Sequence, residues 1–357
     1  MRAVHRTILI LSVFVGPSLP LTGCASGLDL GDAPNGGDAE PGGRTPDGGS
    51  GVESPVADGG VRRDSGDPQR GEDPVQAPDD AVGEDTTTLS VGFRSVCAVK
   101  IDGTLDCWGR ESEARNRPTG TFRSVSVGDS HSCGVREDGT LACWGDNFAG
   151  KANPLPGIFR SVSVGKEHTC GVKADGSVAC WTAEGYDTYG AATPPGGTFR
   201  SVSLGESFTC GVKTDGSLVC WGQTQPQSYS PTPAGTFLSV NSDLLFNCGV
   251  KLEGTVVCWG RTGYDVPEPP AGAFRSVSVG DQHACAVRTD GTVACWGHNE
   301  EGQASPPAGA FRSVSAGALR TCGIKVDGSV ACWGCAVKTP GSFCDGLVDP
   351  PSDLVVK

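Results

Sequence analysis

The sequence of 357 residues has few of the side chains from which large helical cores are built. It contains one Met, and only 6% of its residues are aromatic. Long stripes of Leu and Met on helix faces are therefore excluded as the main source of burial. The absence of any run of Lys and Arg argues against a nucleic-acid-binding surface. The chain has instead 54 Gly, 25 Pro and 17 Cys, a composition typical of strands joined by tight turns.

The beginning of the chain predicts export. Basic residues precede an apolar run from Ile8 to Val15, which is too short to span a bilayer. The sequence Leu21–Cys24 (LTGC) then resembles the lipobox of bacterial lipoproteins, although a secretory signal with an accidental Cys is the alternative. We expect residues 1–23 to be a lipoprotein signal peptide and Cys24 to be the lipid-modified mature N-terminus. The protein would then be anchored in the cell envelope by its lipid at the outer membrane. It would face either the periplasm or the outside of the cell.

The segment that follows predicts a disordered tether over residues 24–88. Residues 25–88 contain 14 Gly, seven Pro, no aromatic residue, and 15 Asp and Glu against four Arg. Such a composition does not bury enough apolar surface to offset the entropy of ordering. This segment carries most of the net charge of −13, so the remainder of the chain is nearly neutral.

Internal repeats organise residues 89–357. Seven copies of a segment such as SVGDSHSCGVREDGTLACWG follow one another, with a period of 36 to 40 residues between successive Trp residues. This period lies in the range of a propeller blade. The Trp residues that define the register are Trp108, Trp144, Trp181, Trp221, Trp259, Trp296 and Trp333.

Each copy predicts a β-hairpin that is closed by a disulfide. Residues 124–127 read SVSV, the alternation typical of a strand, and Glu137–Gly139 supplies a three-residue turn. Pairing about this turn places Cys133 opposite Cys143, at a non-hydrogen-bonded position where cross-strand side chains approach most closely. An exported chain permits such a bond. Free buried thiols are the alternative.

The same spacing of ten residues recurs in every copy, and eight disulfides are expected in all. Cys335 and Cys344 remain after the seven hairpin pairs and Cys24 are assigned, so we expect them to pair with each other. The expected disulfides are Cys97–Cys107, Cys133–Cys143, Cys170–Cys180, Cys210–Cys220, Cys248–Cys258, Cys285–Cys295, Cys322–Cys332 and Cys335–Cys344.

The repeats resemble the regulator of chromosome condensation family. The segment Gly280–Gln303, GDQHACAVRTDGTVACWGHNEEGQ, follows the family pattern nearly throughout, and the resemblance spans residues 90–334. It implies an all-β fold, a single seven-bladed β-propeller with about four short antiparallel strands per blade. Secreted propeller-type β-lactamase inhibitor proteins are the expected architectural relatives. For ring closure we expect the tail Asp353–Lys357 to pair near Leu89–Val91, because a closed ring removes open sheet edges.

Catalytic interpretations have little support in the sequence. His131, His168 and His283 occupy one position in three different copies, a position that also holds Phe and Ser, so we interpret them as structural. Cys332 and Cys335 form a C-x-x-C spacing, but Cys332 has a hairpin partner and no βαβ unit surrounds it. A glycan hydrolase remains an alternative on fold analogy only.

We expect a binding surface where the loop before the His position and the turn after Trp-Gly emerge on one side of the propeller. Aromatic residues gather in these turns, and Tyr offers a large contact area at low entropy cost. The alternative is that the rings pad neighbouring blades. The residues predicted for this surface are Phe148, Tyr186, Tyr189, Tyr229, Tyr264, Phe343, Asp129, Glu167, Glu206 and Asp281.

The predicted function is that of a noncatalytic, surface-anchored scaffold that binds a protein or a glycan. An inhibitor of an envelope or secreted enzyme is the alternative, and a hydrolase is the second. Guanine-nucleotide exchange, which the family resemblance also implies, is disfavoured because the GTPase would lie in another compartment. We expect no cofactor, no metal, no nucleic-acid partner, a monomer, and contact with the membrane through the N-terminal lipid only.

Overall fold

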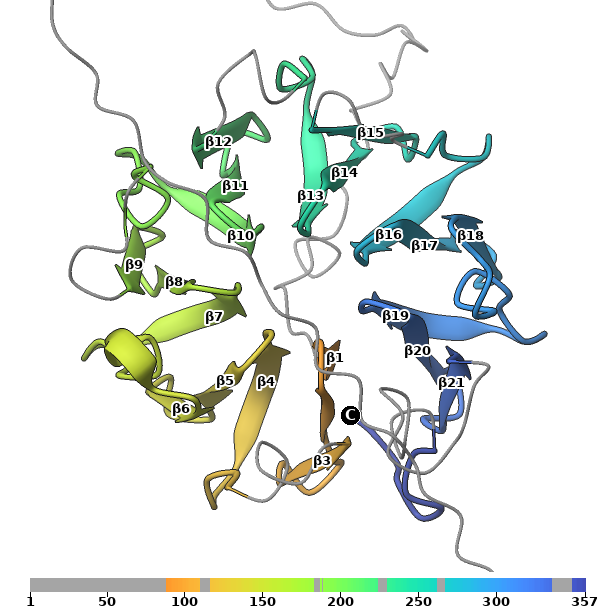
Figure 1. Cartoon of the computed structure of the whole chain (residues 1–357), viewed down its shortest axis with the longest axis horizontal. Helices are drawn as coiled ribbons and strands as arrows, with labels where there is room; N and C mark the ends of the chain where they lie inside the picture. The colour runs from red at the N-terminus through yellow and green to blue at the C-terminus, as the bar shows by residue number, and fades with distance from the viewer. Residues whose placement is uncertain are drawn as a thin grey trace, which may run out of the picture. The chain divides into compact units, whose positions relative to one another are not determined.

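The computed structural model describes residues 88–109, 116–182, 187, 189–223, 230–261, 267–335 and 349–357. In these ranges the chain forms seven antiparallel sheets of three strands each, which we call blades 1 to 7 in chain order. Figure 1 shows the blades around a common centre, with the first strand of most blades directed toward it. First strands of successive blades contact one another, and β1 contacts β19, so the ring is closed. The fold is the all-β, seven-bladed propeller expected from the sequence.

Every blade contributes its three strands in the order in which they occur in the chain. Blades 1 to 4 comprise β1 (Leu89–Val91), β2 (Ser95–Val99) and β3 (Leu105–Gly109); β4 (Phe122–Val127), β5 (His131–Arg136) and β6 (Leu141–Gly145); β7 (Phe159–Val164), β8 (His168–Lys173) and β9 (Val178–Thr182); and β10 (Phe199–Leu204), β11 (Phe208–Lys213) and β12 (Leu218–Gly222).

The remaining three blades follow the same plan. They comprise β13 (Phe237–Ser242), β14 (Phe246–Lys251) and β15 (Val256–Gly260); β16 (Phe274–Val279), β17 (His283–Arg288) and β18 (Val293–Gly297); and β19 (Phe311–Ala316), β20 (Arg320–Lys325) and β21 (Val330–Gly334). A single turn of 3-10 helix, η1 (Phe148–Gly150), follows blade 2.

The predicted hairpin with its disulfide is confirmed in all seven blades. In blade 2 the Arg136 amide donates to the Thr140 carbonyl at 2.8 Å, and Gly139 has a φ of 83°, as the three-residue turn requires. Cys133 and Cys143 lie directly opposite each other, with their Cα atoms 4.0 Å apart. The first Cys of every pair is fully buried. Cys335 is also disulfide-bonded, but Cys344 lies outside the described residues, so their pairing stays a prediction.

The expectation of about four strands per blade is wrong, because the described sheets have three. The fourth strand would have to come from the connector that follows the Trp-Gly turn. The connectors after blades 2 and 6 are described throughout, and neither contains a strand. Both carry Pro, at Pro154 and Pro156 and at Pro306 and Pro307, and Pro has no amide hydrogen to donate to a ladder.

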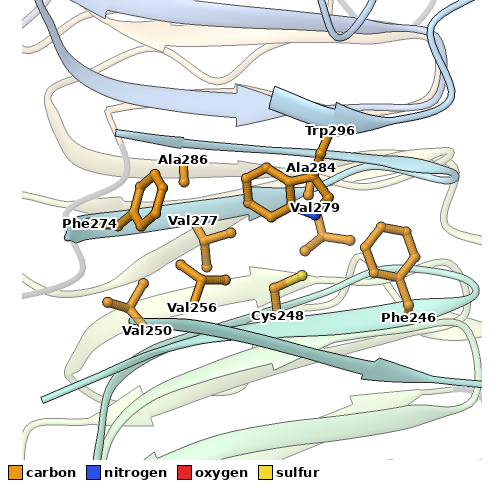
Figure 2. Close-up of a cluster of buried hydrophobic side chains, with 10 residues drawn as sticks. All are labelled: Phe246, Cys248, Val250, Val256, Phe274, Val277, Val279, Ala284, Ala286 and Trp296. Carbon is orange, nitrogen blue, oxygen red and sulfur yellow. The ribbon is translucent and has the colours of Figure 1, made fainter. Parts of the chain in front are cut away.

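The hydrophobic core is divided among the seven seams between blades. The cluster in Figure 2 joins Phe246, Cys248 and Val250 of β14 to Val277 and other side chains of blade 6. The seam between blades 7 and 1 is filled in the same way by side chains from both ends of the described chain. A single blade is a sheet with no partner for its faces, so burial is achieved only when a neighbouring blade covers it.

Close approach at the inner ends of the blades depends on Gly and Ser. A Cβ added at Gly128 would lie 2.5 Å from the Gly165 carbonyl oxygen of the next blade, so only Gly fits there. Beside it, the Ser126 hydroxyl oxygen accepts the amide of Val164 in the next blade at 3.0 Å. The second Ser of the SVSV pattern thus bonds one blade to the next.

The ring closes through the tail, which lies in line with β1 and does not pair with it as we expected. Val356 pairs with Lys100, as Phe122 pairs with Arg136 in blade 2. The Val356 amide donates to the Gly328 carbonyl of blade 7 at 3.1 Å. The Thr88 hydroxyl donates to the Lys357 carbonyl, which joins the two chain ends. The first strand of blade 1 is therefore built from two segments, one from each end of the propeller.

We expect Val356→Ala to lower the free energy of unfolding by about 1–3 kcal/mol, because the side chain fills the closing seam. Its exposed fraction is 2%. Val355→Ala is the matched control: this neighbour is 42% exposed, and we expect a change within about 0.5 kcal/mol. Denaturant-induced unfolding measures both. Equal effects of the two substitutions would contradict the role of Val356.

Candidate functional site

The seven blades enclose a cavity of about 780 Å³ where their first strands end. We call this side, with the loops that join first to second strands, the cavity end. The opposite side, with the turns that join second to third strands, is the hairpin end. Gly and Ser residues form much of the cavity wall, because the inner ends of the blades approach closely there. The charged side chains on the wall are Arg94, Asp129, Asp146, Lys151, Lys166, Glu167, Glu206, Asp243 and Asp281.

Four residues that the sequence predicted for a binding surface share this cavity. Asp129, Glu167, Glu206 and Asp281 come from the loops of blades 2, 3, 4 and 6, and all four line it. Glu206 is neutralised by an ion pair with Lys166, whose Nζ lies 2.5 Å from the carboxylate. The hydrogen bond to Glu206 raises the pKa of Lys166, which therefore stays charged.

Two of these carboxylates lie in an environment that opposes their ionisation. Burial, with the nearby Asp129 as a smaller cause, raises the pKa of Asp281 to about 6. Burial also raises the pKa of Asp129, and Lys166 only partly offsets this. No hydrogen bond contributes to either shift among the described residues. At pH above 6 the Asp281 carboxylate is therefore charged at a cost to the stability of the fold, and burial likewise opposes the charge of Asp129.

Sequence reasoning missed Asp243, which lines the same cavity. It occupies the position that Gly128 holds in blade 2, and this position is Gly in the six other blades. Its Oδ1 accepts the Leu244 amide at 2.6 Å, and burial together with Asp281 raises its pKa well above the usual range. The signal was available in the sequence, because Asp243 is the only side chain at this particular glycine position of the repeat.

The predicted aromatic residues are only partly described. Phe148 lies on the cavity wall and is 62% exposed, held by η1 after blade 2. Tyr189 occupies the corresponding turn of blade 3 and is 54% exposed, but it does not line the cavity. The other four predicted aromatic residues lie outside the described residues: Tyr186, Tyr229, Tyr264 and Phe343. The clustering of these rings on one rim therefore stays a prediction.

The three aligned His residues join blades to one another. His131 Nε2 lies 2.7 Å from the hydroxyl of Thr169 in the next blade. The Thr169 hydroxyl donates its own hydrogen to the Lys151 carbonyl, so the imidazole must be the donor to it. His168 with Thr209 and His283 with Thr321 repeat this arrangement at 2.8 Å. Each imidazole thus holds a seam and is not directed at the cavity as a catalytic base.

Burial keeps these imidazoles neutral. It lowers the pKa of His131 to about 3 and the pKa values of His168 and His283 to about 4. In blade 7 the same position holds Arg320, which is fully buried and donates to the Gly92 carbonyl of blade 1 at 2.6 Å. The position therefore serves contact between blades whichever residue occupies it.

The described ranges also bear on a metal site, a membrane-spanning helix and a redox C-x-x-C. No group of three His, Cys, Asp or Glu residues has an arrangement that would hold a metal ion there. None of the helices described is long and apolar enough to cross a membrane. The C-x-x-C spacing is no redox pair, because Cys332 is bonded to Cys322.

Comparison with known families identifies the repeat. The model of the Regulator of chromosome condensation (RCC1) repeat matches residues 122–151, 199–225 and 274–303, which lie in blades 2, 4 and 6 and the turns after them. The chain contains regulator of chromosome condensation repeats. No curated protein matches the sequence.

Solved structures with the same fold include two plant receptor ectodomains. The CRINKLY WD40 ectodomain of the receptor kinase ACR4 from Arabidopsis thaliana is 26% identical, with 70% of this chain and 95% of that chain covered and a TM-score of 0.59. The ectodomain of the receptor kinase CR4 from Physcomitrella patens is 22% identical, with 70% and 75% covered and a TM-score of 0.57. Prp20p from Saccharomyces cerevisiae is 14% identical, with 73% and 84% covered and a TM-score of 0.54. The last two show the fold alone.

The repeats of this chain that have His at this position pair it with a Thr of the next blade. Where the position holds Phe246 instead, the residue facing it from the next blade is Ala284. A Thr stands at the facing position only where the preceding blade has His. The two residues therefore vary together among the blades of this chain.

We expect the substitution pair His131→Phe with Thr169→Ala, which copies Phe246 and Ala284, to reduce the loss of stability at acidic pH. Above pH 6.5 the imidazole is neutral in both states; as the pH falls toward 4 only the unfolded chain gains the proton, so the folded state loses stability. At pH 5 one such His contributes a loss of about 2 kcal/mol. Unfolding free energies at pH 7 and pH 5 measure this. An unchanged difference between these pH values would contradict the neutral imidazole.

Proposed function

We propose that the protein is an exported, noncatalytic scaffold that binds a protein partner at the cavity end. The observation that carries the proposal is the cavity itself, where burial opposes the ionisation of Asp129 and Asp281 and no described residue donates a hydrogen bond to either carboxylate. Carboxylates that oppose folding and stabilise nothing in the free protein are typical of a site kept for a ligand. The exposed ring of Phe148 adds an apolar contact on the same wall.

Known proteins with this fold support a protein partner. The structure of Prp20p was described together with its binding properties to Gsp1p and histones. The Arabidopsis and Physcomitrella proteins are ectodomains of receptor kinases. Seven disulfides indicate that this chain, like an ectodomain, matures in an oxidising compartment.

The imidazoles provide a second argument for a scaffold. A general base must reach a substrate proton with an accessible atom. His131, His168 and His283 are each at most 3% exposed, and each donates from Nε2 to a Thr of the next blade. The imidazoles are thus closed to a substrate, whereas the carboxylates of the cavity wall are open to a partner.

We expect Asp281→Asn to stabilise the fold and weaken binding at once. At pH 7.5 the carboxylate is charged against its raised pKa, so its removal should raise the free energy of unfolding by about 1–3 kcal/mol. Below pH 4 the carboxyl is protonated in both states, and the gain should vanish. Capture of partners from envelope extracts at pH 7.5 should fall at least about tenfold.

The control for the capture experiment is Leu252→Ser at the hairpin end, where the side chain is 65% exposed; capture by this variant should equal that of the wild type. Equal capture by Asp281→Asn and the wild type would refute the cavity end as the binding site. If the wild-type protein turns over a glycan and the Asp281→Asn variant does not, the protein is a hydrolase and not a noncatalytic scaffold. Stoichiometric inhibition of a captured enzyme would identify the partner class as that enzyme.

We further propose that Cys24, which lies outside the described residues, anchors the scaffold by a lipid at the outer membrane. This part of the proposal depends on the sequence LTGC after the apolar run. The acidic segment 24–88 would then separate the propeller from the anchor, since like charges extend a chain.

Replacement of Cys24 by Ala should move the protein from the membrane fraction to the soluble fraction, because the acceptor of the lipid is lost. Immunoblotting of fractionated cells measures the distribution. Ser26→Ala, two residues further on, is the control and should leave the protein with the membranes. Retention of the Cys24→Ala variant in the membrane fraction, equal to that of the control, would show that the lipobox interpretation is wrong.

A further inference from the structure

The two ends of the propeller expose different kinds of apolar side chain. Among the described residues, the large exposed side chains at the cavity end are the aromatic Phe148 and Tyr189. All the others are aliphatic and lie at the hairpin end, with exposed fractions from 42% to 65%. These aliphatic residues are Ile101, Ile158, Leu252, Val326 and Val355.

The aliphatic side chains lie at or beside the hairpin turns of blades 1, 3, 5 and 7. Ile101, Leu252 and Val326 stand at the same position of the hairpin turn in blades 1, 5 and 7. Ile158 lies beside the corresponding turn of blade 3, where its carbonyl accepts the Ala174 amide at 2.9 Å. Because the blades repeat around one centre, equivalent positions lie on one ring. Blade 7 closes the ring beside blade 1, so Ile101, Val326 and Val355 lie together there, and the Ile101 amide donates to the Val355 carbonyl at 3.3 Å. Ile158 and Leu252 stand elsewhere on the ring.

A second ring at the hairpin end is basic. The last residue of the second strand is Lys or Arg in all seven blades, and every one of these side chains is partly exposed. The set is Lys100, Arg136, Lys173, Lys213, Lys251, Arg288 and Lys325. The second position of the first strand adds Arg123, Arg160, Arg200, Arg275, Arg312 and Lys357.

Acidic residues at this end do not cancel the basic ones. The hairpin turns contribute eight carboxylates against these thirteen basic residues. The described connectors that lead to this end add Glu268, Asp349 and Asp353 against Arg117, which is paired with Asp106 of β3 at 3.7 Å. A small excess of positive charge remains among the described residues of this end. The cavity wall has the opposite sign, with six acidic and three basic residues.

We propose that the hairpin end docks on an anionic lipid surface, with the aliphatic turn residues in the headgroup region and the basic side chains beside the lipid headgroups. Basic side chains near an anionic membrane surface and apolar side chains within it act together. Lys side chains extend along apolar surface while their ammonium groups reach polar groups. The membrane contact then includes the propeller itself and not the N-terminal lipid alone.

The described chain begins at the end of the propeller that faces the lipid in this orientation. The Thr88 carbonyl accepts the amide of Val99, the last residue of β2 before the first hairpin. The segment that precedes Thr88 therefore joins the propeller at the hairpin end. Docking of that end leaves the carboxylates of the cavity end directed away from the lipid, open to a partner in the surrounding compartment.

A flat surface fits this arrangement better than a compact protein partner. A lipid bilayer presents one plane to every hairpin turn on the ring, so it contacts blades 1, 3, 5 and 7 together. A protein partner would gather its main contacts near the centre of one continuous interface. Here Ile158 and Leu252 lie apart from the aliphatic side chains at the seam of blades 7 and 1, and every hairpin turn carries Lys or Arg.

The test is cosedimentation with vesicles, with a chain that begins at residue 24 and carries Cys24→Ser so that no lipid is attached. We expect it to bind vesicles of phosphatidylglycerol and phosphatidylcholine, to bind phosphatidylcholine alone at least about tenfold more weakly, and to be released by salt. Reversing the charge of three side chains without aromatic contacts (Lys173→Glu, Lys251→Glu and Lys325→Glu together) should lower the partition coefficient more than about tenfold.

A second variant separates the apolar contribution from the charge. Ile101→Ser, Leu252→Ser and Val326→Ser together should also weaken binding, and the remaining binding should keep its dependence on salt. Phe148→Ser at the cavity end is the matched control, because its side chain is as exposed as theirs, and it should bind like the parent chain. Thermal unfolding of each variant verifies that the propeller is intact.

Three results would overturn the proposal. The first is equal binding to anionic and neutral vesicles, the second is binding by the two hairpin-end variants at the level of the parent chain, and the third is a loss in the Phe148→Ser control as large as theirs. None of these results bears on partner capture at the cavity end, because that experiment depends on Asp281 and the vesicle experiment on side chains of the hairpin end.

Discussion

Burial between neighbouring blades is the interaction on which the rest of this structure depends. A three-stranded sheet is open on both faces, and each of the seven seams has its own cluster of apolar side chains drawn from two blades. The close approach that this burial requires explains the glycines and the serine hydroxyls at the inner ends of the first strands. It also explains why Val356 matters to the whole ring: its side chain belongs to the cluster that fills the seam between the last blade and the first.

Local geometry made the hairpins and their disulfides predictable. The turn at Glu137–Gly139 determines which residues face each other, so the partner of Cys133 followed from counting residues. The seven Trp residues established the period and hence the number of blades. The number of strands per blade was not predictable in this way, because it depends on whether a connector with Pro finds a ladder partner. That depends on packing between distant segments, and the repeat period carries no information about such packing.

The candidate site was predictable only where it follows the repeat. Asp129 and Asp281 stand at one position of the loop, and a repeated position is easily seen as one surface. Asp243 escaped notice because it interrupts a glycine position, and the sequence alone does not show that this position borders a cavity. The pairing of His131 with Thr169 was also visible in the sequence as covariation between blades, but its meaning required the knowledge that the two residues face each other across a seam.

The disulfides have a consequence for how such a protein is made and enlarged. Each of the seven described bonds joins cysteines ten residues apart within one hairpin, and none connects two blades. Both thiols of a hairpin therefore leave the export machinery before the rest of the chain. Their oxidation needs no cysteine from a distant segment. Duplication of one repeat in the gene would add a complete cross-link and no orphan thiol. The cysteine pattern is thus inherited with the blade, so a family of such chains can change its number of blades without any change in its redox chemistry.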